Sequence, residues 1–215
     1  MLNISIPTLI TRVLTLLIAF TFHEFAHAFV AVQLGDDTPR RDGRLSLDPL
    51  RHLDLWGCIL LIFAGFGWAK PVRVDARAVT RKTKAGMMLV AAAGPCANLI
   101  LAILGAALLR SGAVPRTSFL PNWMPRPMTF LSEFIWINLR LMVFNLIPLY
   151  PLDGEKVVSY FIPDGFRKTW RQIQSYGQQI LMVCFFILPY LHIYFASDFV
   201  NNTSYSLYRM LTGGF

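Results

Sequence analysis

The sequence has few charged residues and few cysteines. Only 15% of its 215 residues are charged and 55% are hydrophobic, whereas soluble domains have about 25% charged and about 45–50% apolar residues. A chain of this composition has more apolar surface than one water-facing core can bury, so we expect a membrane protein. The absence of a C-x-x-C pair argues against a disulfide framework or a thiolate zinc site. We expect the three cysteines to be buried, small apolar side chains: Cys58, Cys96 and Cys184.

Acidic residues are also scarce, since 12 of them accompany 20 basic residues and leave a net charge of +8. The basic residues lie between long apolar runs, without a basic helix or an aromatic surface that could bind bases. We therefore expect a lipid bilayer with anionic headgroups as a partner, and no nucleic acid. Most of the basic residues fall within 35–86 and 151–175. The positive-inside rule predicts that these two connections are cytoplasmic and that both termini lie outside.

Long apolar runs make up much of the chain. Residues 8–34 contain neither Gly nor Pro and would extend about 40 Å as a helix, more than a hydrocarbon core of about 30 Å requires. This run lacks a basic start and is too long for a signal peptide, so we expect it to be retained. Three further runs have spanning length: residues 87–109, 128–149 and 179–196. The sequence predicts one domain over residues 1–215, an all-α polytopic membrane protein with about four transmembrane helices.

The segment 44–74, between the first two expected spans, has a different pattern. Residues 56–69 are apolar, but Gly65 and Gly67 interrupt a run of only 14 residues. That length predicts a re-entrant or interfacial element rather than a crossing. The flanks at 44–47 and 72–74 alternate briefly between polar and apolar residues, and we expect them to form short strands.

The strongest chemical signal is His23-Glu24-Phe25-Ala26-His27, inside the first apolar run. Histidines four residues apart lie on one face of a helix, so both imidazoles can bind one zinc ion. Glu24 lies beside them, where its carboxylate can take a proton from water at the metal. A chance H-E-x-x-H on an ordinary helix is the alternative. Charged groups within a span cost about 2.5–3.5 kcal/mol each, and a bound cation would compensate for that cost.

A catalytic zinc ion usually has three protein ligands, so a third must come from elsewhere. Asp153 follows directly on the third apolar run and is expected at the depth of the histidine pair. Pro148 and Pro151 disrupt the helix before it, and irregular backbone at this depth is tolerated where it lines a cavity. The alternative is an interfacial turn, because P-L-D-G is common turn chemistry. The rival ligands are His52, Asp54, Glu133 and His192, the last two expected toward the outer side.

These motifs resemble the site-2 protease family of intramembrane metalloproteases. The resemblance rests on H-E-x-x-H in the first core span, on G-P-x-x-N at residues 94–98, and on N-x-x-P-x-x-P-L-D-G at residues 145–154. Residues 43–49, 52–54 and 67–71 are similar to the compact prokaryotic branch, which lacks an appended regulatory domain. At 47–49 the chain has Leu-Asp-Pro where Leu-Asn-Pro is usual.

The family resemblance implies one zinc ion per chain. Its ligands would be His23, His27 and Asp153, and Glu24 would activate the attacking water. It further implies a protein of the prokaryotic plasma membrane that hydrolyses transmembrane protein substrates, with its active site toward the cytoplasm.

Two asparagines and a His-x-Asp pair are candidate supporting residues. Asn98 follows a run of small residues that favours tight packing beside the metal helix, and it is also a candidate to bind the substrate backbone. In the family, the asparagine that Asn145 matches lies near the metal, so it is expected either to stabilise the developing oxyanion or to form a helix–helix hydrogen bond. His52 and Asp54 are expected at the interface or beside a ligand, in contact with substrate or orienting the site. Arg140, inside the third span, needs a partner or a water-filled path.

Two other classes of function are alternatives to an enzyme. A non-catalytic, zinc-containing membrane scaffold or chaperone would bind helices without cutting them, but a structural metal needs no general base such as Glu24. A channel or transporter is disfavoured because the sequence has no inverted repeat. The sequence therefore predicts a zinc-dependent intramembrane endopeptidase.

Overall fold

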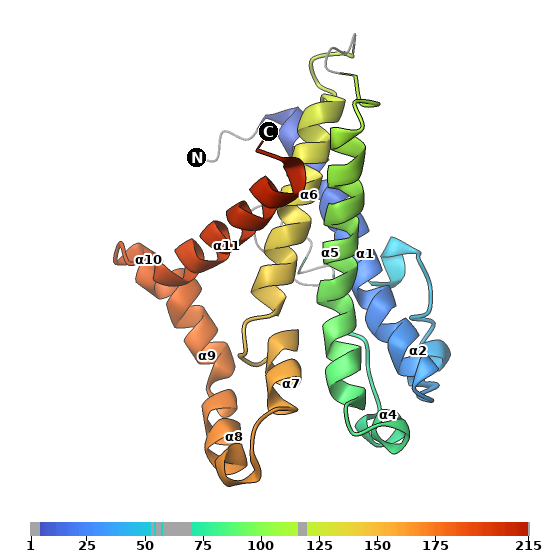
Figure 1. The fold of residues 1–215 in the computed structure, drawn as a ribbon, viewed down its shortest axis with the longest axis vertical. Helices are drawn as coiled ribbons and strands as arrows, with labels where there is room; N and C mark the ends of the chain where they lie inside the picture. Colours follow the sequence, from blue (N-terminus) through green and yellow to red (C-terminus); the bar gives the residue numbers. More distant parts are fainter. Residues whose placement is uncertain (1–4, 53, 55–56, 58–69, 116–119, 215) are drawn as a thin grey trace.

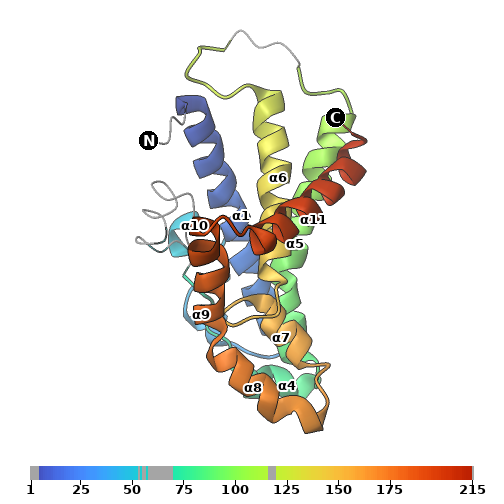
Figure 2. The same cartoon turned by 90° about the vertical axis from the view of Figure 1, so that its left-hand side faces the viewer.

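Three long helices run side by side through the molecule (Figures 1 and 2). They are α1 (Ile6–Gln33), α5 (Gly86–Arg110) and α6 (Pro127–Asn145), and α5 packs against both of the others. This computed structural model describes residues 5–52, 54, 57, 70–115 and 120–214, and within those ranges every regular element is a helix. The all-α prediction is thereby confirmed for the part of the chain described.

The distribution of polar residues on α1 is the reverse of that on a helix in water. Ser5 caps its first turn by accepting a hydrogen bond from the Thr8 amide, and Gly35, at φ 94°, follows its end. Large apolar side chains face outward, among them Leu14, Phe22 and Phe29. The buried side chains are mostly small or polar: Thr11, Thr15, Ala19, Thr21, His23, Glu24, His27, Ala28 and Ala31. An apolar exterior around a polar interior is the arrangement expected of a span.

Small residues on α5 allow α6 to approach closely. Ala102, Gly105 and Ala106 are buried against Ile135 and its neighbours in the main apolar core. A Cβ added at Gly105 would lie 2.9 Å from Ile135 Cγ1. Close helix approach of this kind is common in membrane bundles, where packing rather than hydrophobic burial holds helices together.

The predicted number of spans is only partly supported. Among the described residues, α1 and α5 are long and apolar enough to cross a membrane, and the bent pair α9–α11 would make a third if it is one broken span. The predicted runs 8–34 and 87–109 thus match α1 and α5 closely. The third predicted run, 128–149, corresponds to α6, which ends at Asn145. This helix is less apolar than α1 and α5, because it contains Glu133, Asn138 and Arg140.

The fourth expected span, 179–196, is not one continuous helix. The chain forms α9 (Gly177–Met182), a π-helix (Val183–Ile187) and α10 (Leu188–Tyr190), and then bends by 97° into α11 (Phe195–Thr212). His192, at φ 61°, lies in the bend. The helix α11 was not predicted, because its many polar residues interrupt any apolar run.

The two predicted strands at 44–47 and 72–74 are not formed among the residues described. A bend lies at residues 45–46, and residues 70–75 have no regular secondary structure. The Val72 amide instead donates to the Glu24 carboxylate, so the hydrogen bond that a strand would need is used elsewhere. The apolar part of the predicted re-entrant element, including Cys58, lies almost entirely outside the described residues.

Short helical elements make up the connections between the longer helices. They are α2 (Thr38–Arg41), a 3₁₀ turn (Pro49–Arg51), α4 (Ala76–Lys82), α7 (Asp153–Ser159), a second 3₁₀ turn (Asp164–Phe166) and α8 (Arg167–Ser175). Figure 1 shows the start of α1 and the end of α11 at the upper end, with α4 and α8 at the lower end. The helices α4 and α8, one from each basic connection, therefore lie at the same end of the molecule, as the predicted topology requires.

The prediction of buried cysteines is wrong for Cys96 and only half right for Cys184. Cys96 is exposed on α5 and Cys184 is half-buried in the π-helix. The outer face of α5 is apolar and exposed along its length, so a cysteine on that face can be apolar in character without being buried by protein.

Candidate metal centre

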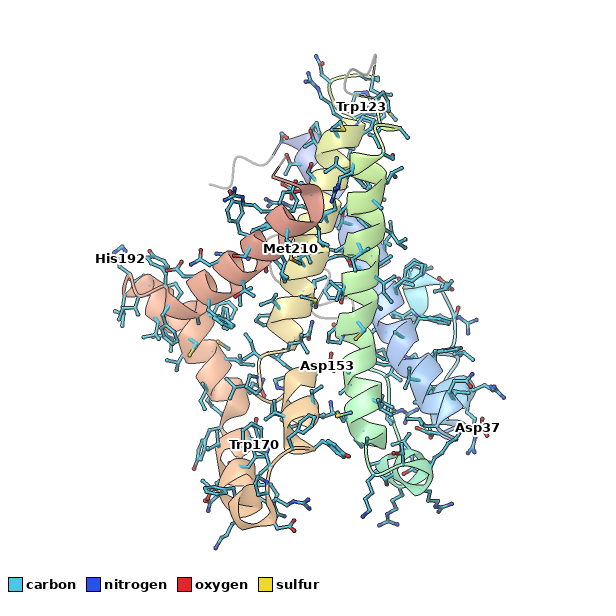
Figure 3. All side chains as sticks on the ribbon, viewed as in Figure 1. Asp37, Trp123, Asp153, Trp170, His192 and Met210 are labelled. Carbon is cyan, nitrogen blue, oxygen red and sulfur yellow. The ribbon has the colours of Figure 1, made fainter. Side chains whose placement is uncertain are left out.

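Three side chains from two distant parts of the sequence converge inside the helix bundle. His23 and His27 project from α1, and Asp153 is the first residue of α7. The two Nε2 atoms are 3.1 Å apart, and Asp153 Oδ2 lies 3.1 Å from that of His23 and 3.3 Å from that of His27. All three residues are almost fully buried. Figure 3 shows Asp153 at the start of α7, where α7 runs beside α5.

The spacing of these three atoms fits a zinc ion. Tetrahedral coordination with bonds of about 2.0–2.2 Å places ligand atoms about 3.3 Å apart. Asp153 Oδ2 is buried yet has no hydrogen-bond partner, and a buried orphan oxygen among metal-ligating side chains is accounted for by a cation. No other group of three such residues among those described comes together in this way.

Hydrogen bonds fix which nitrogen of each imidazole faces the centre. His27 Nδ1 donates to the Val90 carbonyl at 2.7 Å, and His23 Nδ1 donates to Asn98 Oδ1 at 2.7 Å. Since each Nδ1 carries a proton, each Nε2 is left to face the centre as a ligand. Partners of this kind on the far side of a metal-binding histidine fix the ring orientation and raise its basicity.

Asp153 is brought to the histidines by a tightly held loop between α6 and α7. An added Cβ at Gly154 would lie 2.2 Å from the Leu146 carbonyl oxygen, so only glycine allows α7 to start against the end of α6. Gln174, buried on α8, accepts from the Tyr150 amide at 2.8 Å and donates to the Pro148 carbonyl at 3.0 Å. The broken segment predicted from the prolines is therefore anchored by a glutamine that the sequence analysis did not single out.

Glu24 is buried, follows His23 on α1, and is held by the segment 70–75. Its Oε2 atom accepts a hydrogen bond from the Val72 amide at 3.2 Å. The segment is fixed at both ends, because the Lys70 amide donates to the His52 carbonyl at 2.8 Å and the Asp75 amide donates to Asp36 Oδ2 at 2.7 Å. The candidate base is thus positioned by backbone rather than by a flexible side chain.

The other predicted residues occupy different places. Asn98 is fully buried and contacts His23, so it faces the cluster from behind rather than a substrate. Asn145 ends α6, and its amide donates to the Leu141 carbonyl of its own helix at 2.9 Å. His52 is buried with Nε2 2.6 Å from the Ser46 carbonyl, and Asp54 accepts from the Gly57 amide at 3.0 Å. Neither of these two residues joins the metal cluster.

The remaining candidates lie away from Asp153. Glu133 lines a cavity of about 300 Å³ near the start of α1 and α6, and His192 lies at the exposed bend before α11 (Figure 3). Arg140 is exposed on α6, where its guanidinium carbon is 5.9 Å from the centre of the Trp136 ring. The Trp136 ring is therefore a partner for this arginine, through a cation–π contact.

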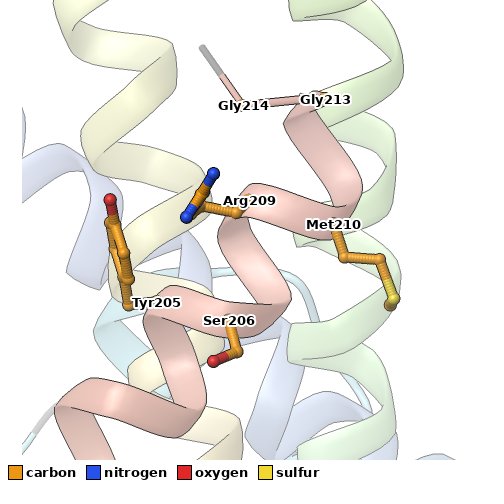
Figure 4. Close-up of a pocket in the computed structure, with 6 residues that line it drawn as sticks. All are labelled: Tyr205, Ser206, Arg209, Met210, Gly213 and Gly214. Carbon is orange, nitrogen blue, oxygen red and sulfur yellow. The ribbon is translucent and has the colours of Figure 1, made fainter.

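A second, larger cavity of about 460 Å³ lies at the C-terminal end of α11 (Figure 4). In it, the Arg209 guanidinium carbon lies 5.9 Å from the centre of the Tyr205 ring. None of the described residues that line it is a histidine, a cysteine or a carboxylate. Its lining residues are Tyr205, Ser206, Arg209, Met210, Gly213 and Gly214.

The fold and the cluster together define a helical protein with a candidate His₂Asp metal site built on H-E-x-x-H. Two segments of the chain, residues 11–120 and 117–188, match Peptidase family M50. The chain therefore belongs to peptidase family M50, the site-2 protease family.

Individual relatives agree with this assignment. The chain is 44% identical over 173 residues to "Putative zinc metalloprotease YwhC" of Bacillus subtilis, covering 80% of this chain and 78% of that protein. It is 28% identical over 204 residues to "Putative zinc metalloprotease Rip2" of Mycolicibacterium smegmatis, covering 88% and 73%. A Rip2 protein of Mycobacterium tuberculosis is 31% identical over 173 residues, covering 79% and 64%. No solved structure gives a significant match.

Proposed function

We propose that this protein is a zinc-dependent endopeptidase that cleaves membrane-protein substrates within or near their transmembrane segments. The observation that carries the proposal is the convergence of His23, His27 and Asp153 at ligand spacing with Glu24 beside them. Membership of a peptidase family and relatives named as zinc metalloproteases support it.

The chain's own residues divide the work of peptide hydrolysis. When bound by His23, His27 and Asp153, one zinc ion would supply a Lewis acid that polarises the scissile carbonyl and acidifies water. Glu24 is the group that takes a proton from the attacking water and returns it to the leaving amide nitrogen. The Val72 amide restrains the carboxylate at Oε2, so that the base does not need to be ordered during the reaction.

Asn145 remains the proposed oxyanion donor. Its amide is bonded to its own helix, and it would exchange this bond for one to the substrate, since catalytic hydrogen bonds often tighten only in the complex. A donor of this kind is worth about 3–4 kcal/mol in other hydrolases.

The segment 70–75 is the proposed guide for the substrate backbone. A helical substrate must unwind before cleavage, because its amides are bonded internally. An unwound stretch lying beside this segment would be next to Glu24, and strand addition is a common way to bind such a peptide. The segment has no strand partner among the residues described, which supports this role.

The burial and surroundings of the centre support a site inside the membrane. His27 lies six residues, or about 9 Å, before the end of α1, on the side of the basic connections. The relatives are bacterial proteins. We therefore propose the prokaryotic plasma membrane as the location, with the active site toward the cytoplasm.

A non-catalytic zinc-containing scaffold or chaperone is the alternative, and Glu24 argues against it. A structural metal needs no buried carboxylate beside its ligands, and burying one costs free energy. The test is incubation of the purified protein with a panel of single-span substrates, with and without a chelator. Cleavage that stops with chelator and returns with added zinc is expected. Binding of the substrates without any cleavage would favour the scaffold.

A further inference from the structure

A chain of buried amides runs behind the metal centre and ends on a residue outside the family motifs quoted above. Asn138, in the middle of α6, is fully buried, as is Asn98 on α5. Asn98 Nδ2 lies 3.0 Å from Asn138 Oδ1 and 3.3 Å from the Ala19 carbonyl, while Asn98 Oδ1 lies 2.7 Å from His23 Nδ1. Three helices, α1, α5 and α6, are thereby joined by one polar path.

The direction of every hydrogen bond in this path follows from its backbone ends. Asn138 Nδ2 is 2.9 Å from the Phe134 carbonyl, which can only accept, so the other atom of this amide is the oxygen. That oxygen and the Ala19 carbonyl both require a donor, so the Asn98 atom facing them is the NH₂ group. Asn98 must then present its oxygen to His23, and His23 Nδ1 must carry the proton.

We infer that Asn138 is a positioning residue, which fixes the orientation of Asn98 and through it presents His23 Nε2 to the metal without a proton. If the Asn98 amide turned over, its NH₂ group would face His23 Nδ1 and drive the ring proton to Nε2. A protonated Nε2 cannot bind zinc. The Ala19 carbonyl resists such a turn only through a 3.3 Å contact, and Asn138 supplies the shorter one.

The test is zinc affinity of the purified protein, measured by competition with a chromophoric chelator. Asn138→Leu, and Asn138→Ala as a variant without added apolar bulk, should bind zinc about ten-fold or more weakly than wild type, the scale seen when partners of metal-binding histidines are removed. Asn138→Asp should recover most of the affinity. A buried, neutral carboxylic acid accepts from Asn98 and donates to the Phe134 carbonyl as the amide does.

Two controls separate orientation from packing. Ser204→Ala removes a buried hydroxyl that has no hydrogen-bond partner, and should leave zinc affinity unchanged. In an Asn98→Asp background both outer atoms of residue 98 are oxygens, so either orientation accepts from His23. Asn138→Leu should then cause no further loss of affinity.

Wild-type affinity in folded Asn138→Leu or Asn138→Ala protein would overturn the inference, and so would an equal loss in both backgrounds. The inference rests on the proposed function only in taking His23 as a zinc ligand. Affinity is measured without substrate, so a protein that binds zinc tightly but cleaves nothing would contradict the proposed function and leave the role of Asn138 standing.

Discussion

Gly94 on α5 is the position where a single methyl group should disable the metal centre. A Cβ added there would lie 2.4 Å from His27 Nε2 and 2.6 Å from His23 Nε2. Ordinary contacts begin at 3.4 Å, so Gly94→Ala must displace at least one ligand, or the helix, by about 1 Å. Metal sites tolerate deviations of only about 0.2 Å in ligand distance.

The expected result of Gly94→Ala is a folded protein that has lost its zinc. Alanine favours a helix over glycine by about 0.8–1 kcal/mol, and overpacking typically costs about 1–3 kcal/mol, so the two effects partly offset each other in the stability of the fold. A misplacement of about 1 Å at the site is expected to lower cleavage by about 100-fold. Zinc content by elemental analysis, unfolding temperature and cleavage rate would be measured on the same preparation.

Gly105→Ala is the matched control, because it places the same methyl group on the same face of α5 three turns away. There the added Cβ would meet Ile135 Cγ1 at 2.9 Å and Phe134 Cδ1 at 3.3 Å, both on flexible side chains. This variant should lose some stability but keep its zinc. If Gly94→Ala bound zinc as tightly as Gly105→Ala, the close packing of α5 on the two imidazoles would be wrong.

Three further predictions follow from the same arrangement. The double alanine variant of the two ligand histidines should contain no stoichiometric zinc, and unchanged metal content in the folded variant would remove them as ligands. Gln174→Ala removes the part-buried hydrogen bonds to the Tyr150 amide and the Pro148 carbonyl, each worth about 0.5–1.5 kcal/mol. It should loosen the Asp153 loop and weaken zinc binding, whereas the neighbouring exposed Gln172→Ala should not. In a cysteine-free background, Cys at Arg77 and Cys at Asn122 should be labelled from opposite sides of the membrane, and labelling from the same side would refute the proposed topology.

The ligands on α1 could be predicted from the sequence because their geometry is local. Residues i and i+4 share a helix face wherever a helix forms, and a long run without Gly or Pro makes the helix itself predictable. Predicting Asp153 as a ligand required more information, since its approach to the histidines depends on how the chain turns after α6. The prolines indicated a break there, and the family resemblance indicated which carboxylate follows it.

The residues that support the ligands could not be predicted in the same way. Asn138 and Gln174 act through contacts with α5 and with the loop before α7, 40 and 24–26 residues away in sequence. Nothing in the local sequence pattern distinguishes an asparagine that bonds a neighbouring helix from an asparagine that does not. Polar residues within an expected span are nonetheless costly, and that cost was a signal that Asn138 has a partner.

The missing strands and the break in the fourth predicted run have physical reasons of the same kind. The alternation at 72–74 is typical of a strand, but a strand also needs a partner, and the Val72 amide bonds Glu24 instead. The apolar run 179–196 is long enough for a span, yet the chain turns at His192 and continues into a polar helix. Hydropathy measures whether a segment prefers an apolar or an aqueous environment, and it does not determine where the backbone bends.

The measurement that tests the central claim most directly compares Glu24→Gln with Asp153→Ala. Glutamine keeps the size and hydrogen-bonding capacity of the Glu24 side chain but cannot act as a base. Glu24→Gln should retain zinc and cleave a transmembrane substrate at least about 100-fold more slowly, the usual scale for loss of a general base. Asp153→Ala should lose both zinc and activity, because it removes a ligand. Cleavage by Glu24→Gln at the wild-type rate would contradict the proposed mechanism.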